Sequence, residues 1–241
     1  MEKQPRSRRT RPAKPALSRK WIIAETVKIM RTEGLEKATM RRVAQALDTG
    51  PASLYVYVAN TAELHAAVLD ELIGSLPQDG PGDWQERIHT LLGAYSDLLF
   101  RYPGLARSAL ALRPAGPHTI RLFDRVLGLL IDGDVPADRA AWGTDLLLQQ
   151  VTATAAEHGD PGSDGIDAPV GGEAKTHALE RAVRTAVPAT APHVAAHADA
   201  VLAGPPSARS TWAIHVLLTG IAATPIPRQP RTNPAPLADL G

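Results

Sequence analysis

The sequence predicts an all-α fold, in which a small N-terminal unit of short helices precedes a larger helical domain. Of the 241 residues, 44% are hydrophobic but only 4% are aromatic, so the core must consist mainly of Ala, Leu, Val and Ile. Ala and Leu favour helix, and few runs are rich in the β-branched and aromatic residues that favour strand. Apolar residues also recur at helical spacing through most of the chain.

Charge is distributed unevenly along the chain, although the net charge is only +1. Residues 1–42 contain 13 Lys and Arg against 4 Asp and Glu, whereas residues 43–241 contain 13 against 21. The N-terminal end is therefore suited to a polyanion. A solvated basic tail is the alternative for residues 1–20, but the positive charge continues into helical sequence at Arg41 and Arg42, which favours binding.

Composition and motifs exclude several classes of site. The chain has no cysteine, which excludes disulfides and thiolate metal sites. No apolar run approaches the roughly 20 residues of a membrane-spanning helix, and no signal-peptide core follows the basic N-terminus, so we expect a cytoplasmic protein without a membrane partner. His193 and His197 have the spacing of metal ligands, but Asp199 is their only nearby acid. No catalytic or nucleotide-binding motif occurs, so we expect no metal, no cofactor and no enzyme activity.

Three short helices are predicted behind a segment that cannot form a core. Residues 1–17 combine Arg and Lys with Pro, which predicts a disordered basic arm. Ser18 can cap a first helix, and Thr39 can cap a second. After a turn over residues 48–50, Pro51 suits the first position of a third helix. The side chains expected inside this unit are Ile23, Val27, Met30, Met40, Val43, Ala44, Leu47, Leu54 and Val58.

Longer helices are predicted over the remainder of the chain. Asn60 and Glu63 form a capping-box pattern that opens the next helix. A regular apolar stripe runs from Trp84 to Tyr102. Further helices are expected over residues 105–112, 120–132, 136–157, from 173 to a break at 188–192, weakly on to 202, and over 207–224. Residues 159–172 are rich in Gly, Asp and Pro and are expected to be a mobile loop.

The second and third predicted helices, of about eight and six residues with a three-residue turn between them, form a helix-turn-helix pattern. In such a unit one helix braces across the phosphate backbone, and the other lies in the major groove, where each base pair has a distinct pattern of donors and acceptors. The first helix supports the pair from behind. The chain thus divides into a disordered basic arm (1–17), a helix-turn-helix DNA-binding domain (18–60), a helical ligand-binding and dimerisation domain (61–224) and a Pro-rich tail (225–241).

Residues 18–72 resemble the signature of TetR-type repressors. Three blocks with matching spacing carry the resemblance: Thr39-Met40-Arg41-Arg42-Val43-Ala44 followed by Leu47, then Ser53-Leu54-Tyr55-Val56-Tyr57-Val58, then Asn60-Thr61-Ala62-Glu63-Leu64. The resemblance implies a homodimeric transcriptional regulator that binds palindromic double-stranded operator DNA and is released by an unidentified small-molecule effector. The later helices are similar to the family only in their architecture.

The resemblance also implies roles for individual residues. Arg41 corresponds to a position that contacts a guanine or a phosphate, and Thr39 to a phosphate-binding cap. Tyr57 corresponds to an aromatic residue at a phosphate. Thr61 stands where the family usually has a phosphate-binding Lys, so that contact loses its charge. The residues expected at DNA are Thr39, Arg41, Arg42, Gly50, Pro51, Ala52, Ser53, Tyr55, Tyr57 and Thr61, with core packing as the alternative for Tyr55 and solvated charges as the alternative for Arg41 and Arg42.

The larger domain is expected to form the dimer and to bind the effector. The helices over residues 136–157 and 207–224 are apolar on more than one face, as in a four-helix bundle made with a second copy, and Leu218 is expected at this contact. The effector would favour a state in which the two recognition helices no longer lie about 34–36 Å apart. Candidate effector contacts, with core or dimer packing as their alternative, are His89, Tyr95, Trp142, Asp145 and Gln149.

Two other functions remain open from the sequence. An all-helical enzyme or small-molecule carrier would explain neither the charge distribution nor the three blocks, and turnover of a small molecule would identify it. A nucleoid-type architectural protein would bind DNA through the basic arm without sequence preference, and it would not need the larger domain. Specific duplex binding that weakens steeply with salt would distinguish a regulator from both.

Overall fold

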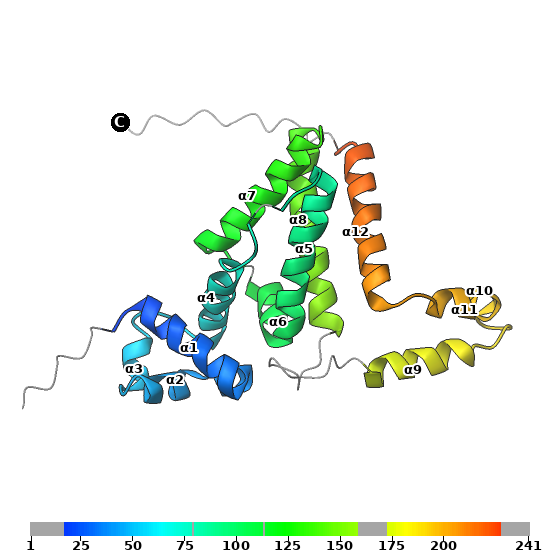
Figure 1. The fold of residues 1–241 in the computed structure, drawn as a ribbon. Coiled ribbons are helices and arrows are strands. Elements are labelled where there is room, and N and C mark those ends of the chain that lie inside the picture. Colours follow the sequence, from blue (N-terminus) through cyan, green and yellow to red (C-terminus); the bar gives the residue numbers. More distant parts are fainter. Residues whose placement is uncertain (1–16, 79, 113, 159–172, 228–241) are drawn as a thin grey trace, which may run out of the picture.

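The computed structural model describes residues 17–78, 80–112, 114–158 and 173–227, which form helices and connecting loops without a strand (Figure 1). The prediction of an all-α fold is confirmed for this part of the chain. The predicted disordered arm (1–17), mobile loop (159–172) and Pro-rich tail (225–241) lie outside the described residues, except for Leu17 and residues 225–227. Leu17 is half-buried and packs against the hydrophobic core, so the prediction of disorder is wrong at this residue. The elements are α1 (Arg19–Glu33), η1 (Leu35–Lys37), α2 (Met40–Ala46), α3 (Pro51–Leu54), α4 (Thr61–Ile73), α5 (Trp84–Arg101), α6 (Pro103–Leu112), α7 (Pro117–Asp132), α8 (Ala137–His158), α9 (Glu173–Arg184), α10 (Pro192–Ala196), α11 (Ala198–Leu202) and α12 (Pro206–Ala223).

Helices α1, α2 and α3 form a small N-terminal bundle whose first two helices are capped as the sequence predicts. Ser18 Oγ accepts a hydrogen bond from Trp21 N (3.2 Å), and Thr39 Oγ1 accepts one from Arg42 N (3.2 Å). Of the side chains predicted inside the bundle, Val27 is half-buried and the others are buried. The apolar spacing of these three segments therefore identified their inner faces.

Helix α3 is shorter than predicted, because it ends at Leu54 after four residues. Beyond it the chain turns, and Tyr57 N and Val58 N both donate to Leu54 O (2.9 and 3.1 Å). This turn returns Val58 to the core. Before α3, Asp48 has a φ of 51°, a left-handed conformation that Asp tolerates better than most residues.

Helix α4 connects the N-terminal bundle to the larger domain, and it contacts α1 at one end and α6 and α7 further along (Figure 1). Helix α8 lies at the centre of the larger domain and contacts α5, α6, α7 and α12. The regular stripe of α5 is buried at Ile88, Leu91, Leu92, Tyr95 and Leu99. Within the described residues, no helix has both the length and the apolar character needed to cross a membrane.

Helices α8 and α12 approach each other closely near one end. A Cβ atom at Gly143 would lie 2.6 Å from Ile221 Cγ2, so the missing side chain allows the contact. Arg139 Nη1 donates to Ala222 O (2.7 Å) and ties the two helices further. Leu218 faces into this contact and is 2% exposed. The prediction that Leu218 lies at a dimer contact is therefore wrong, because its own protomer already covers it.

Helices α9, α10 and α11 form a lateral segment, residues 173–203, that packs mainly on itself. Figure 1 shows it extending away from the larger domain beyond α12. Among its described side chains only Val183 is buried, and Leu179 and Val187 are exposed.

Candidate nucleic-acid interface

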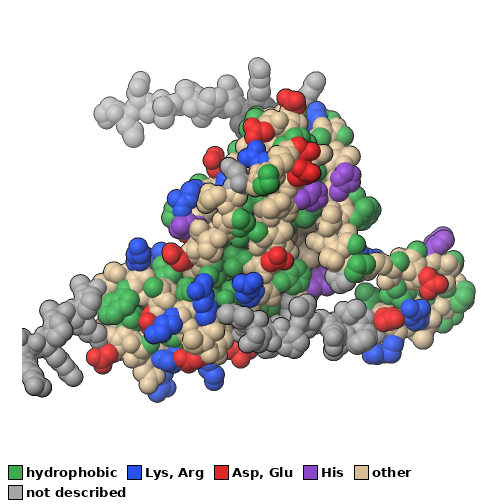
Figure 2. Space-filling model, in the orientation of Figure 1, with side chains coloured by type: hydrophobic (Ala, Val, Ile, Leu, Met, Phe, Trp, Pro, Cys, Tyr) green, Lys and Arg blue, Asp and Glu red, His purple; other side chains and the backbone are tan. Residues whose placement is uncertain are grey.

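The residues expected at DNA lie on α2, on α3 and in the turns beside them, and most of them are exposed. Gly50, Pro51 and Ala52 at the start of α3 are exposed, and Ser53 is half-buried. Tyr55 is 55% exposed, which argues against core packing as its main role. Figure 2 shows Lys and Arg side chains around the α1–α3 part of the molecule, with some acidic side chains among them. The start of α3 is thus an accessible uncharged surface near several cations.

Thr39 and Arg41 have the chemistry needed for contacts to DNA. The exposed Thr39 hydroxyl accepts a hydrogen bond from Arg42 N, so its proton stays available to an acceptor such as a phosphate oxygen. Arg41 is exposed, and its guanidinium has no hydrogen bond or ion pair with another described residue.

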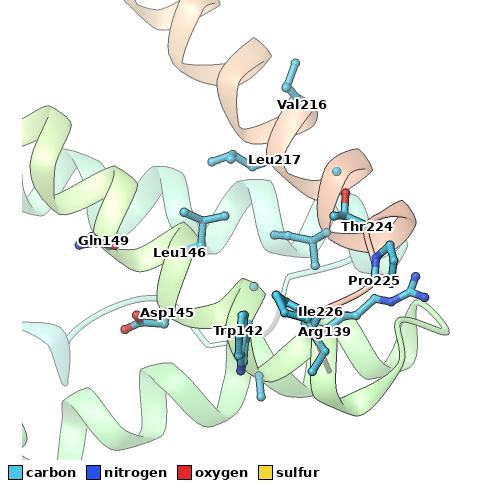
Figure 3. Close-up of a pocket in the computed structure, with 15 residues that line it drawn as sticks. Arg139, Trp142, Asp145, Leu146, Gln149, Val216, Leu217, Thr224, Pro225 and Ile226 are labelled. Carbon is cyan, nitrogen blue, oxygen red and sulfur yellow. The ribbon is translucent and has the colours of Figure 1, made fainter. Parts of the chain in front are cut away.

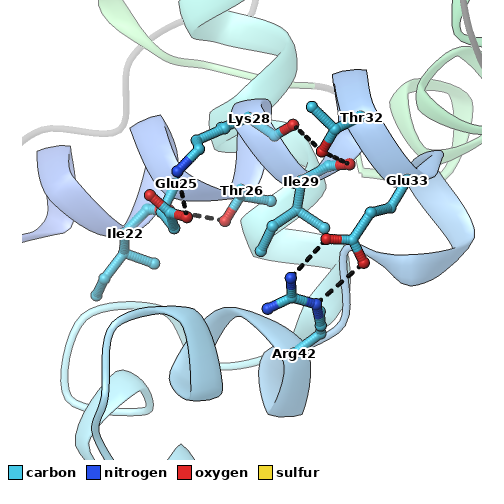
Figure 4. Close-up of polar contacts among 8 residues, drawn as sticks. All are labelled: Ile22, Glu25, Thr26, Lys28, Ile29, Thr32, Glu33 and Arg42. Carbon is cyan, nitrogen blue, oxygen red and sulfur yellow. Dashed lines mark hydrogen bonds and ion pairs between the residues drawn. The ribbon is translucent and has the colours of Figure 1, made fainter.

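Arg42, by contrast, is paired with Glu33 at the end of α1 (Figure 4). Arg42 Nε donates to Glu33 Oε2 (3.0 Å), and Arg42 Nη2 donates to Glu33 Oε1 (2.5 Å). This bidentate hydrogen bond lowers the pKa of the Glu33 carboxyl. Both side chains are 35% exposed, so the pair, which links α2 to the end of α1, contributes little to stability. The role of Arg42 at DNA stays a prediction.

Tyr57 is half-buried, and its hydroxyl donates to Leu17 O (2.7 Å). Leu17 immediately precedes Ser18, the cap of α1, so the bond joins the turn after α3 to the start of α1. This contact was not predicted from the sequence. The partners are 40 residues apart, and no periodic pattern relates a tyrosine hydroxyl to a distant carbonyl.

Two further residues extend the exposed surface around α3. Val56 is 81% exposed, and it was not among the contacts predicted from the sequence. Its position opposite the buried Leu54 and Val58 was a usable signal. Thr61 is exposed at the first position of α4, beside the Asn60 cap.

A buried carboxylate joins α4 to the larger domain. Asp70 on α4 accepts hydrogen bonds from Thr119 N and Thr119 Oγ1 (both 2.8 Å) and from His118 N (3.4 Å), at the start of α7. It therefore caps α7 from another helix, because Gly116 supplies no capping side chain. A Cβ atom at Gly116 would lie 2.2 Å from Asp70 Cγ, so this contact requires glycine. The uncapped Gly116-Pro117 helix start was the available sequence signal.

His65 forms a second connection between α4 and the larger domain. Its Nδ1 lies 3.4 Å from Ser108 Oγ on α6, and its Nε2 is buried without a hydrogen-bond partner among the described residues. Burial lowers the pKa of His65, and the backbone of Ala38, in the N-terminal bundle, opposes this shift. His65 thus lies where α4, α6 and the N-terminal bundle meet.

Three of the five predicted effector contacts line one trough between α8 and α12, of about 800 Å³ (Figure 3). Trp142, Asp145 and Gln149 contribute from α8, and Val216 and Ile221 from α12. Trp142 is 49% exposed. The trough is therefore an open surface feature with mostly apolar walls.

The other two candidates, Tyr95 and His89, lie outside the trough. Tyr95 is buried with its hydroxyl 3.0 Å from Thr152 Oγ1 of α8, and burial raises the pKa of Tyr95. Burial lowers the pKa of the half-buried His89, and His215 on α12 adds to the shift. Within the described residues, no group of three or more His, Asp or Glu side chains is placed to hold a metal ion.

Residues 76–224, more than half of the chain, match the family of tetracyclin repressor-like C-terminal domains. The chain is also 32% identical over 128 residues to the HTH-type transcriptional repressor DrrR1 of Streptomyces coeruleorubidus, a match that covers 51% of this chain and 47% of the relative. The chain spans about half the length of the curated relatives it matches.

Solved structures are similar over most of the chain. One is a Streptomyces coelicolor protein assigned as a transcription regulator, SCO7704, with 49% identity and a TM-score of 0.76, covering 90% of this chain and 100% of that one. Another is ActR from Streptomyces coelicolor in complex with actinorhodin, with 28% identity and a TM-score of 0.70, covering 85% of this chain and 96% of that one.

Proposed function

The chain belongs to the TetR family of transcriptional regulators, and on this premise we propose that it is a sequence-specific repressor that a small-molecule effector releases from a palindromic operator. The observation that carries the proposal is the exposed start of α3, residues 50–52, which α2 braces while itself packing on α1, together with the unengaged Arg41 guanidinium on α2. An enzyme or carrier without a DNA role would not account for this surface.

The chemistry of α3 indicates how the operator is read. The segment from Gly50 to Val58 contains no charged or amide side chain, so it lacks the groups that make bidentate hydrogen bonds to bases. Among the residues predicted at DNA, only Arg41 and Arg42 carry such groups, and Glu33 holds Arg42. Arg41 therefore makes the main polar base contact, and the exposed Val56 contacts apolar groups such as thymine methyls.

Two copies associate through α8 and α12 in this proposal. The outer face of these helices exposes the apolar side chains Trp142 (49%), Leu146 (43%), Trp212 (68%) and Val216 (44%). Trp142, Leu146 and Val216 line one trough. Soluble monomers rarely expose large contiguous apolar patches, and a second copy would cover this face. Two-fold symmetry would then direct two α3 helices to successive half-sites.

The effector binds in the larger domain. ActR was crystallised with actinorhodin and with (S)-DNPA, which supports a small-molecule ligand for this chain also. Tyr95 pairs with Thr152 inside the domain, whereas Trp142, Asp145 and Gln149 line the trough that a second copy would cover. A Trp142→Ala variant that remains dimeric but no longer responds to the effector would assign Trp142 to the effector rather than to the dimer.

We place the boundary between the two domains between residues 60 and 61. Helix α4 transmits the effect of effector binding from the larger domain to the N-terminal bundle. Asp70 attaches it to α7, and His65 lies against α6. An effector that displaces α6 or α7 would thus move α4 and, with it, the N-terminal bundle. The effector changes DNA affinity only by its differential binding to the two states, typically by about 1–3 kcal/mol.

Binding to a duplex that the wild-type protein selects from a randomised pool tests the function. We expect specific binding that weakens steeply with salt. Arg41→Ala should weaken it by about 1–3 kcal/mol and relax specificity at one base position, with an unchanged melting temperature because Arg41 is exposed. Arg101→Ala removes an exposed cation of the larger domain and should have no effect. Absence of specific binding by the wild type would refute the proposed function.

A further inference from the structure

Gln45 on α2 combines an exposed side chain with an unengaged amide group. Helix α2 buries Met40, Val43 and Ala44 against the core, whereas Gln45 is exposed on another face of the helix. The Gln45 amide has no hydrogen bond with another described residue. It therefore keeps two N–H donors and a carbonyl acceptor for a partner from outside the chain.

The position of Gln45 connects Arg41 with the start of α3. Gln45 and Arg41 are four residues apart, and residues at this spacing lie on the same helix face, one turn apart. Helix α2 ends at Ala46 and α3 begins at Pro51, so Gln45 lies on the last turn of α2 before the chain turns into α3. Asp48 N donates to Gln45 O (3.1 Å), which attaches that turn directly to this end of α2.

The amide group of Gln45 has a chemistry that α3 lacks. In the major groove, a Gln or Asn amide recognises adenine, because its N–H donates to N7 while its oxygen accepts from the N6 amino group. Residues 17–60 contain two amide side chains, Gln45 and Asn60. The Asn60 oxygen caps α4 by accepting from Glu63 N (2.8 Å). Gln45 is therefore the amide side chain in this range that is available for a base.

We propose that Gln45 is a specificity-determining residue, which reads an adenine of each operator half-site near the base pair that Arg41 contacts. The inference rests on the proposed DNA-binding function, and it extends the base-reading surface from α3 onto α2. Four residues of helix span about 6 Å, and successive nucleotides of a strand lie about 3.4 Å apart along the DNA axis. The adenine should therefore lie within about two base pairs of the base that Arg41 contacts.

Selection from a randomised pool of duplexes, with the full-length chain, tests the inference. The wild type should prefer adenine at one position of each half-site. Gln45→Ala should accept any base there, while it keeps the preference that Arg41→Ala relaxes. On a duplex that contains the adenine, Gln45→Ala should bind about 5- to 150-fold more weakly than the wild type, which is the loss expected from one bidentate contact. When that base pair is replaced, the two proteins should bind about equally.

Two further variants make the test specific to the amide. Gln45→Glu keeps the length of the side chain but replaces its donor by an acceptor, so it cannot serve adenine N7 and should also lose the adenine preference. Gln85→Ala removes an exposed amide of α5 and should change neither preference nor affinity. Because Gln45 and Gln85 are both exposed, each variant should melt at the wild-type temperature.

Several results would overturn the inference. Equal weakening by Gln45→Ala on all sequences would make Gln45 a phosphate contact, and unchanged preference and affinity would make it a solvated side chain. An adenine preference that Gln45→Glu retains would exclude the bidentate contact, and a lowered melting temperature of Gln45→Ala would assign the side chain to the fold. Each of these results leaves the proposed function intact, because specific binding by the wild type tests that separately. If the wild type selected no sequence, the proposed function would fail together with the inference.

Discussion

Two exposed apolar surfaces of this chain differ in what surrounds them. After α3, Tyr55 and Val56 are 55% and 81% exposed, and the same small bundle carries the exposed cation Arg41. On α8 and α12, Trp142 and Trp212 are 49% and 68% exposed, and the exposed Leu146 and Val216 lie on the same helices, with Gln149 and His215 as exposed polar side chains. Exposure alone therefore does not identify a partner. The first surface suits a polyanion with apolar base edges, and the second suits another copy of the chain.

The two surfaces lie on different helices, so a change in one should leave the other folded. Operator binding, however, should need both, because a palindrome is read by two copies.

The largest expected effect comes from breaking the α8 and α12 surface. The double variant Leu146→Asp, Trp212→Asp places charge on exposed positions, so each protomer should stay folded while the dimer dissociates. Operator affinity should fall by about 100-fold or more, because the second half-site is no longer bound by a linked partner. Sedimentation at micromolar concentration and DNA binding measure the two effects.

Leu218→Asp tests a buried position on α12, the helix that also carries the exposed Trp212. Leu218 is 2% exposed, so this variant should unfold instead of giving a folded monomer. If the wild type itself sedimented as a monomer without DNA, both the dimer and the half-site argument would have to be abandoned.

The parts of the fold that were predicted correctly depend on interactions between residues close together in the sequence. Three helix caps were predicted correctly, namely Ser18, Thr39 and Asn60. Each cap side chain accepts a hydrogen bond from a backbone N–H three residues further along the chain. Such contacts depend on local sequence, as do the inner faces of the short helices. The length of α3 was overestimated, because the turn that follows Leu54 keeps Val58 inward without a helix.

The contacts that the sequence did not reveal are between distant residues. Tyr57 and Leu17 are 40 residues apart, and Asp70 and Thr119 are 49 apart. Leu218 was misassigned for the same reason, since an apolar helix position does not show whether its own chain or a second copy covers it. The residues of the candidate DNA surface could therefore largely be predicted. The long-range contacts that support this surface, and the division of the effector candidates between the trough and positions outside it, required the structure.

A smaller effect is expected at the link between the two domains. Asp70→Ala removes the cap of α7, so the free energy of unfolding should fall by about 0.5–2 kcal/mol, and effector-induced release from DNA should weaken. Chemical denaturation and an effector titration measure these changes. The matched control is Asp97→Ala, an exposed carboxylate of α5, which should change neither.

Gly116→Ala provides an independent check of the same link. Its Cβ would overlap the Asp70 carboxylate, so it should destabilise the protein in the same direction although no charge is removed. Wild-type stability in both variants would contradict a role for this cap in joining α4 to α7.

The smallest effect concerns His65, which lies between the N-terminal bundle and α6. Burial lowers the pKa of His65 below its ordinary value of 6.5, so the unfolded chain binds the proton first as pH falls. Stability should therefore decrease as the pH drops below about 6.5, with a slope of at most about 1.4 kcal/mol per pH unit for this one proton, and should level off once the folded His65 is itself protonated. Above that range His65 contributes no slope.

The pKa of His89 is shifted in the same direction, so the wild type should show both contributions, and His65→Gln should remove only one of them. The difference between wild-type and His65→Gln denaturation curves across this range isolates the effect. If that difference did not change with pH while His89→Gln did alter the slope, the buried imidazole between the two domains would not be the group that titrates.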